Sequence, residues 1–159
     1  MRLLMAGCVA LLSFALGCSR TPSNSEVFNQ PAAIPAGAPL DPLQWKVITS
    51  SIDAPHQTMS MLFGNDVAVA SARSGKQGKY PAGAVLSLVT WAQQEDRHWF
   101  GARIPKQFQT MEIVKVTPGA EGETTTSYER FEGQGLQKAS DGDEARKAYI
   151  LLQRAAVMP

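Results

Sequence analysis

The chain has 159 residues, which is enough for one domain with a substantial core. Its 44% hydrophobic and 18% charged content is typical of a globular protein and excludes a wholly disordered one. The formal net charge is +1 and no block of basic residues is present, which argues against nucleic acid as a partner.

The N-terminal residues have the three-part form of a secretory signal. Arg2 precedes an apolar run from Leu3 to Leu16, and Gly17-Cys18 follows. The run is shorter than the roughly 20 residues of a membrane-spanning helix. A small residue followed by Cys at this place is similar to the processing site of bacterial lipoproteins, although Leu16 stands where a small residue is usual. The alternatives are a plain cleaved signal and an uncleaved anchor.

We therefore expect a signal peptide over residues 1–17 and a lipid on Cys18 that anchors a periplasm-facing protein to a membrane. Ser19 and Arg20 follow Cys18, so no Asp stands there to retain the protein in the inner membrane, and the outer membrane is favoured. Because the second cysteine, Cys8, also lies in the signal, the mature domain would hold no internal disulfide and no thiolate metal site.

A linker and a folded domain are expected after the signal. Residues 18–42 are rich in Pro, Ala and Ser and have no apolar periodicity, which indicates a linker. The folded domain is expected over residues 43–159. Its first segment, Gln44 to Ile52, is compatible with either a helix or a strand.

Alternating apolar residues then predict a half-buried strand over residues 58–64, with Met59, Met61 and Phe63 on one face. Asn65 is placed to cap a short Ala-rich helix, which Gly75 would end.

The next segment predicts a central strand that is covered on both sides, because both of its faces are apolar. Its two faces are Ala84, Leu86 and Leu88, and Val85, Val89 and Trp91. A long polar connection over residues 93–107 is expected to follow.

Two more strands and a helix complete the chain. Residues 108–116 and 124–132 predict strands, and Tyr128 and Phe131 are expected on opposite faces of the second. Residues 141–158 predict a helix, with Asp141 and Glu144 at capping-box spacing. Its expected apolar stripe is Ala145, Ala148, Tyr149, Leu152, Ala155 and Ala156. The fold expected is α+β: a mainly antiparallel sheet with a short helix after the first strand and a C-terminal helix.

Motifs for catalysis are absent from the sequence, which favours a binding module over an enzyme. There is no phosphate-binding loop, no nucleophile elbow and no cysteine nucleophile after Cys18. His56 and His98 are weak metal-ligand candidates, because they are far apart and lie in polar segments.

A pocket against the sheet is the other candidate site. Glu112 lies between apolar residues in a predicted strand. The methionines are possible ligands of haem iron, but core packing is the favoured role, because Met is a routine gap-filler. The candidate lining residues are Met59, Met61, Trp91, Trp99, Phe100, Met111 and Glu112. The aromatic ones could instead cap one end of the sheet.

The order of these elements resembles the cytochrome P460 family. The likeness depends on Phe63-Gly64-Asn65, the short helix, Tyr80-Pro81-x-Gly83 and the apolar strand after it, and extends over roughly residues 45–134. It implies a periplasmic, mainly antiparallel domain that is often a homodimer. In haem-bearing members it implies a c-type haem on a Cys-x-x-Cys-His motif near the C-terminus, with hydroxylamine or nitric oxide chemistry and, in the cytochromes P460, a lysine cross-link to the haem.

This sequence departs from that pattern, because its C-terminal residues 144–159 contain no cysteine and no histidine. No haem-binding residue can be carried over, and the cross-linking lysine cannot be assigned among Lys76, Lys79 and Lys115. We therefore expect no cofactor, an unidentified ligand or partner, and a haem-free binding module. The alternative is a redox protein that binds haem without covalent attachment, through His56 or His98.

Overall fold

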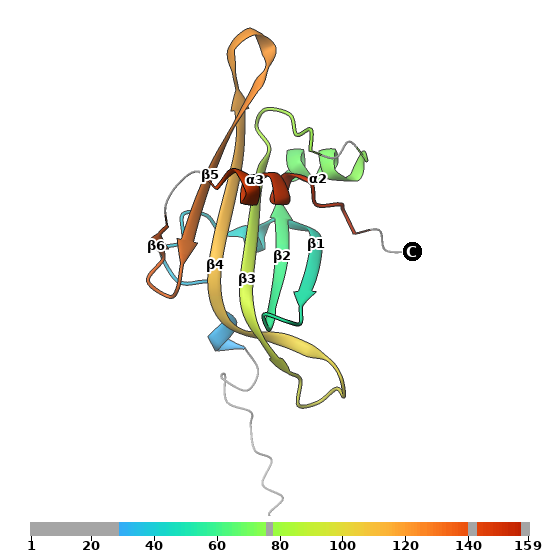
Figure 1. Cartoon of the computed structure of the whole chain (residues 1–159), viewed down its shortest axis with the longest axis vertical. Helices are drawn as coiled ribbons and strands as arrows, with labels where there is room; N and C mark the ends of the chain where they lie inside the picture. The colour runs from blue at the N-terminus through green and yellow to red at the C-terminus, as the bar shows by residue number, and fades with distance from the viewer. Residues whose placement is uncertain (1–28, 76–77, 140–142, 157–159) are drawn as a thin grey trace, which may run out of the picture.

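Six strands pair in the order in which they occur in the sequence, and every pair is antiparallel (Figure 1). The computed structural model describes residues 29–75, 78–139 and 143–156. The strands are β1 (Lys46–Asp53), β2 (Thr58–Gly64), β3 (Val85–Glu95), β4 (Arg103–Pro118), β5 (Thr124–Glu132) and β6 (Gln137–Lys138). With the two α-helices of the described residues, α2 and α3, they confirm the expected α+β fold.

The alternation in the sequence correctly predicted which side chains share a face. Met59 and Phe63 of β2 lie on one face, and Leu62 lies on the other. In β3, Leu86 and Leu88 face one way and Val89 and Trp91 the other. The segment that fitted either a helix or a strand is β1, so α2 follows the second strand of the sheet.

Helix α2 (Asp66–Arg73) begins at Asn65, as predicted. The Asn65 side chain accepts hydrogen bonds from the backbone N–H of Ala68 at 3.0 Å and of Val85 at 3.2 Å. Its Nδ2 donates to the carbonyl of Gly83 at 2.8 Å. One amide therefore caps the helix and also joins it to the start of β3.

Helix α3 (Glu144–Leu151) differs from the prediction in its cap and in its buried side. Asp143 caps the helix by accepting from the backbone N–H of Arg146 at 2.9 Å, and Asp141 lies outside the described residues. The predicted apolar stripe was wrong, because Ala145, Ala148, Tyr149, Leu152 and Ala156 are exposed. Ile150 is instead fully buried, and Arg146 reaches Glu112 in the sheet. The helix is short, so these two anchors decide which side faces the sheet.

The two faces of the sheet carry separate hydrophobic clusters. Helices α2 and α3 cover the helix-side cluster, which is Ile48, Leu62, Ala68, Val69, Tyr80, Ala84, Leu86, Leu88, Val114, Val116, Tyr128 and Ile150. The opposite face holds the N-terminal-side cluster, which is Met59, Phe63, Val89, Trp91, Phe108, Met111 and Ile113.

The segment before β1 packs against the N-terminal-side cluster. It contains two single-turn 3₁₀ helices, η1 (Gln30–Ala32) and η2 (Pro42–Gln44). Its packed residues include Ala32, Ile34, Ala38 and Leu40. The sequence predicted a linker here, because isolated apolar residues among prolines form no periodic pattern. They can nevertheless be buried against a flat apolar sheet face.

The polar residues between β3 and the next predicted strand also pair. Gln93 lies opposite Pro105, and Glu95 lies opposite Arg103, so the β3–β4 hairpin extends beyond the rest of the sheet (Figure 1). Polar residues suit a two-stranded ribbon that water reaches from both sides. Among the described residues, no helix has the length and apolar character needed to cross a membrane.

Candidate functional site

The residues predicted to line a pocket lie in three different places. Met59, Trp91 and Met111 come together in the N-terminal-side cluster, and Met61 packs against it. Glu112 is buried near the opposite face, where it contacts Tyr128 and α3. The other two, Trp99 and Phe100, are exposed at the tip of the β3–β4 hairpin and belong to neither cluster.

Trp91 is held against the N-terminal segment rather than beside an open space. Its side chain is 5% exposed, and its indole Nε1 donates to the carbonyl of Ala32 at 2.8 Å. Ala32 and Ile34 pack on the same cluster. The chain itself therefore covers the apolar face that Trp91 helps to form.

Glu112 is a buried carboxylate with three hydrogen bonds. Arg146 donates to it twice, from Nε to Oε1 at 3.0 Å and from Nη2 to Oε2 at 2.6 Å. The hydroxyl of Tyr128 donates to Oε1 at 2.6 Å. Because these donors satisfy both oxygens, the carboxylate links β4, β5 and α3 and is not poised to act on a ligand.

The pKa values of its partners follow from this arrangement. Burial raises the pKa of Tyr128 far above its usual value, and the hydrogen bond to Glu112 raises it further. The hydrogen bonds to Glu112 raise the pKa of Arg146, so the guanidinium stays charged at every physiological pH.

The two histidines occupy separate exposed turns. His56 Nδ1 lies 2.8 Å from Asp53 Oδ2, and His98 Nδ1 lies 3.2 Å from Asp96 Oδ1. No group of three potential ligands from His, Cys, Asp and Glu could hold a metal ion in the described parts of the chain.

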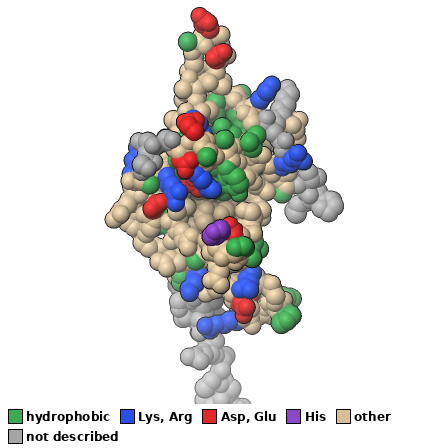
Figure 2. All heavy atoms as spheres, in the orientation of Figure 1, with side chains coloured by type: hydrophobic (Ala, Val, Ile, Leu, Met, Phe, Trp, Pro, Cys, Tyr) green, Lys and Arg blue, Asp and Glu red, His purple; other side chains and the backbone are tan. Residues whose placement is uncertain are grey.

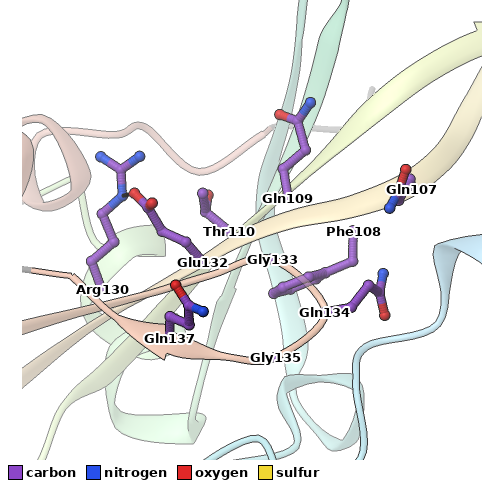
Figure 3. Close-up of a pocket in the computed structure, with 10 residues that line it drawn as sticks. All are labelled: Gln107, Phe108, Gln109, Thr110, Arg130, Glu132, Gly133, Gln134, Gly135 and Gln137. Atoms are coloured by element: carbon purple, nitrogen blue, oxygen red, sulfur yellow. Dashed lines mark ion pairs between the residues drawn. The ribbon is translucent and has the colours of Figure 1, made fainter.

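A polar hollow that the sequence analysis missed lies at β4, β5 and the turn before β6. It has a volume of about 590 Å³ (Figure 3). Its residues are Gln107, Phe108, Gln109, Thr110, Arg130, Glu132, Gly133, Gln134, Gly135 and Gln137. Figure 3 shows Gln107 and Gln134 at one end and the Arg130–Glu132 ion pair at the other. A second hollow of about 390 Å³ shares Gln107 and Gln134 and adds Gln30, Gln94 and Lys106. We call the two together the glutamine-lined groove.

Two irregularities of the backbone shape this groove. Thr90 pairs with Thr110 and Trp91 with Phe108, so Gln109 is the extra residue of a β-bulge. The carbonyl of Gln109 accepts from the N–H of Gly133 at 2.8 Å, and Gly133 and Leu136 both have positive φ. The bulge thus joins β4 to a tight turn that presents Gln134.

The chemistry of the larger hollow is that of neutral hydrogen bonding, whereas Lys106 adds one cationic group to the second hollow. Each glutamine amide offers both a donor and an acceptor, and Arg130 is paired with Glu132 at 2.8 Å. Phe108 is almost fully buried, so it supports the groove from below. The available sequence signals were two glutamines at i and i+2, Gln107 and Gln109, and a third glutamine, Gln134, between two glycines. Exposed polar residues are too common for these signals to indicate a site by themselves.

The antiparallel sheet, the Asn65-capped helix and the short C-terminal helix together define a small α+β sheet domain. The sequence profile of the family described as Cytochrome P460 matches residues 41–148, and the chain belongs to that family. Among curated proteins, no relative matches this chain.

The residues present do not fit the covalently attached haem that the resemblance implies. The printed sequence has cysteines only at positions 8 and 18, outside the described residues, and histidines only at 56 and 98. The C-terminal helix offers Arg146 to the sheet, and that side chain is already engaged by Glu112. The described residues include no cysteine, and their two histidines lie in exposed turns and not in this helix, so the described chain offers no set of thiols and imidazole for haem attachment here.

Proposed function

We propose that this protein is a lipid-anchored component of the cell envelope whose P460-family domain works without haem, as a binding module. The observation that carries the proposal is the set of side chains available to attach and ligate a haem. The C-terminal helix places Ile150 and Arg146 against the sheet, where Arg146 pairs with Glu112, whereas attachment of haem would need two thiols and an imidazole. The glutamine-lined groove is the surface offered to a ligand.

The haem-free part of the proposal is tested by spectroscopy. The full chain is produced in a bacterial host that attaches c-type haem, and the purified protein is examined for a Soret band and for haem content. We expect no stoichiometric haem. One haem per chain that disappears in His98→Ala but not in His56→Ala would establish the redox alternative instead.

The larger hollow of the groove fits an uncharged ligand rich in hydroxyl and amide groups, because its glutamines donate and accept without charge and its Arg130 and Glu132 form an ion pair. A short N-acetylglucosamine oligomer is a suitable probe. Gln134→Ala should weaken its binding about tenfold, the loss expected for one or two hydrogen bonds. Gln153→Ala is the matched control, because Gln153 lies just after α3 and donates to the carbonyl of Tyr149. Equal affinity in both variants would exclude the groove as the site for this probe.

Lipid anchoring is tested by fractionation. Cys18→Ala should move the protein from the membrane fraction to the soluble fraction, because the thiol that would carry the lipid is gone. A wild-type protein that is already soluble would contradict the proposed anchor and the envelope membrane location with it.

A further inference from the structure

The most exposed aromatic residues of the described chain are adjacent to each other. Trp99 is 73% exposed and Phe100 is 109% exposed, at the tip of the β3–β4 hairpin. The hydrophobic contribution of such side chains is lost when they face water, and adjacent exposed aromatics indicate an interaction surface.

The backbone holds this tip in one shape. The N–H of Asp96 donates to the carbonyl of Ala102, and the N–H of Ala102 donates to that of Trp99, both at 3.0 Å. The Asp96 carboxylate accepts from the N–H of His98 at 2.8 Å, and Gly101 has a φ of 78°. The aromatic residues are therefore presented outward by a closed turn.

The hairpin lies at the same end of the molecule as Asn29, the first residue that the structure describes. Asn29 Nδ2 donates to the carbonyl of Pro105 at 2.6 Å, and η1 and the hairpin are both at the bottom of Figure 1. Cys18 is eleven residues before Asn29. A fully extended chain of that length spans at most about 40 Å. A lipid on Cys18 would keep this end of the domain close to the bilayer.

The charges around the tip suit an anionic lipid surface. Residues 95–106 contain three basic residues, Arg97, Arg103 and Lys106, and two acidic ones, so their net charge is +1. Of the acidic residues, Glu95 is paired with Arg103 at 3.4 Å and Asp96 accepts a hydrogen bond from the backbone of the turn. Figure 2 shows Lys and Arg side chains beside hydrophobic ones at this lower end. Basic residues next to Trp and Phe are typical of segments that bind at the membrane interface.

We infer that the hairpin tip inserts Trp99 and Phe100 into the interfacial region of the lipid bilayer, beside the lipid anchor. The inference rests on the proposed anchoring at Cys18. It adds a second membrane contact, which fixes the orientation of the domain, because a single lipid anchor leaves a domain free to rotate.

Fluorescence quenching tests the inference. The mature lipoprotein is reconstituted into vesicles of phosphatidylethanolamine and phosphatidylglycerol, with or without spin-labelled lipids that quench tryptophan from within the bilayer. The wild type should lose emission to the spin label. Trp99→Phe, which retains Trp45 and Trp91, should show little loss. Flotation of the same vesicles reports anchoring independently.

Each outcome has a defined meaning. Lipid quenching that is present in the wild type and absent in Trp99→Phe supports insertion. Quenching by aqueous iodide, without lipid quenching, would mean that the tip faces water, where a protein partner could bind it, and would overturn the inference. Protein that floats but shows no lipid quenching overturns the insertion and leaves the anchor intact. Protein that does not float overturns the anchor and, with it, the inference.

Discussion

Glu112 carries a carboxylate, yet it is only 2% exposed and lies in β4 between the apolar residues Met111 and Ile113. Taking a carboxylate out of water is costly, and Arg146 and Tyr128 offset this cost with three hydrogen bonds. The complete network has little net effect on the free energy of unfolding, whereas removal of one partner is strongly destabilising, because it leaves a desolvated charge. A single side chain thus decides how α3 sits on the sheet.

Glu112→Gln should lower the free energy of unfolding by about 3 kcal/mol, because Arg146 would be left half-buried without a counter-charge. Glu129→Gln is the control, since Glu129 pairs with Lys115 and Lys138 near the surface and should cost less than about 1 kcal/mol. Urea denaturation measures both. Equal losses would show that the buried pair has no special weight.

Glu129 also predicts a pH dependence. The hydrogen bond from Lys138, with the charge of Lys115, holds the pKa of Glu129 below its usual 4.5. Because the folded pKa lies below the unfolded one, this stabilisation is present above about pH 4.5 and is lost as pH falls through the folded pKa. Glu129→Gln should therefore narrow the difference in unfolding midpoint between pH 7 and pH 3. An unchanged difference would contradict this contribution.

At the scale of elements, the connection between β2 and β3 depends on two neighbouring residues: Gly64, which allows close packing, and Asn65, whose side-chain amide makes hydrogen bonds. Gly64 ends β2 where an added Cβ would lie 2.7 Å from Ile48 Cδ1 and 3.0 Å from Ala68 Cβ, so a side chain there would displace the buried Ile48 side chain and press on α2. Asn65 then starts α2 and bonds to Gly83 and Val85 at the beginning of β3. The helix is thereby fixed against the sheet at its first turn.

Asn65→Ala should destabilise the protein by about 2 kcal/mol, the combined effect of a lost helix cap and of unpaired backbone groups. Asn65→Ser should recover roughly half of this loss, because its hydroxyl can cap Ala68 but cannot bridge to Gly83. In thermal unfolding, the midpoint temperature should decrease from the wild type to Asn65→Ser and again to Asn65→Ala. If Ser and Ala were equally unstable, the cap itself would not contribute.

At the scale of the whole molecule, the sheet has two faces and two different covers. Helices α2 and α3 cover one face, and a segment with little regular structure covers the other. The Trp91 indole is the hydrogen-bonding link between the N-terminal-side cluster and that segment. The burial of the N-terminal-side cluster therefore depends on the segment that precedes β1.

Trp91→Phe should cost about 2 kcal/mol, through the lost bond to Ala32 and the smaller buried volume. Trp99→Phe provides the matched control and should change stability by less than about 0.5 kcal/mol, since Trp99 is exposed. Urea denaturation compares the two tryptophans. A costly Trp99→Phe would mean that the hairpin tip packs within the domain.

Local patterns in the sequence determined the central parts of β2, β3, β4 and β5, their buried faces and the cap of α2, because each depends on residues that are close along the chain. They left β1 open between a helix and a strand. Met59 and Phe63, or Leu86 and Leu88, share a face through the geometry of a strand alone. Family membership could also be inferred from the sequence, since it depends on the order of such elements.

Contacts between distant residues were decided only by the tertiary structure. The buried side of α3 follows from Arg146 meeting Glu112, thirty-four positions away, which outweighs a weak apolar stripe. Trp91 and Trp99 are the same residue type, yet one is covered by Ala32 and the other is carried into solvent on a hairpin. The glutamine-lined groove exists because a bulge at Gln109 meets the turn at Gly133. A linear sequence does not record which surfaces meet, because burial is set by the partners that the fold supplies.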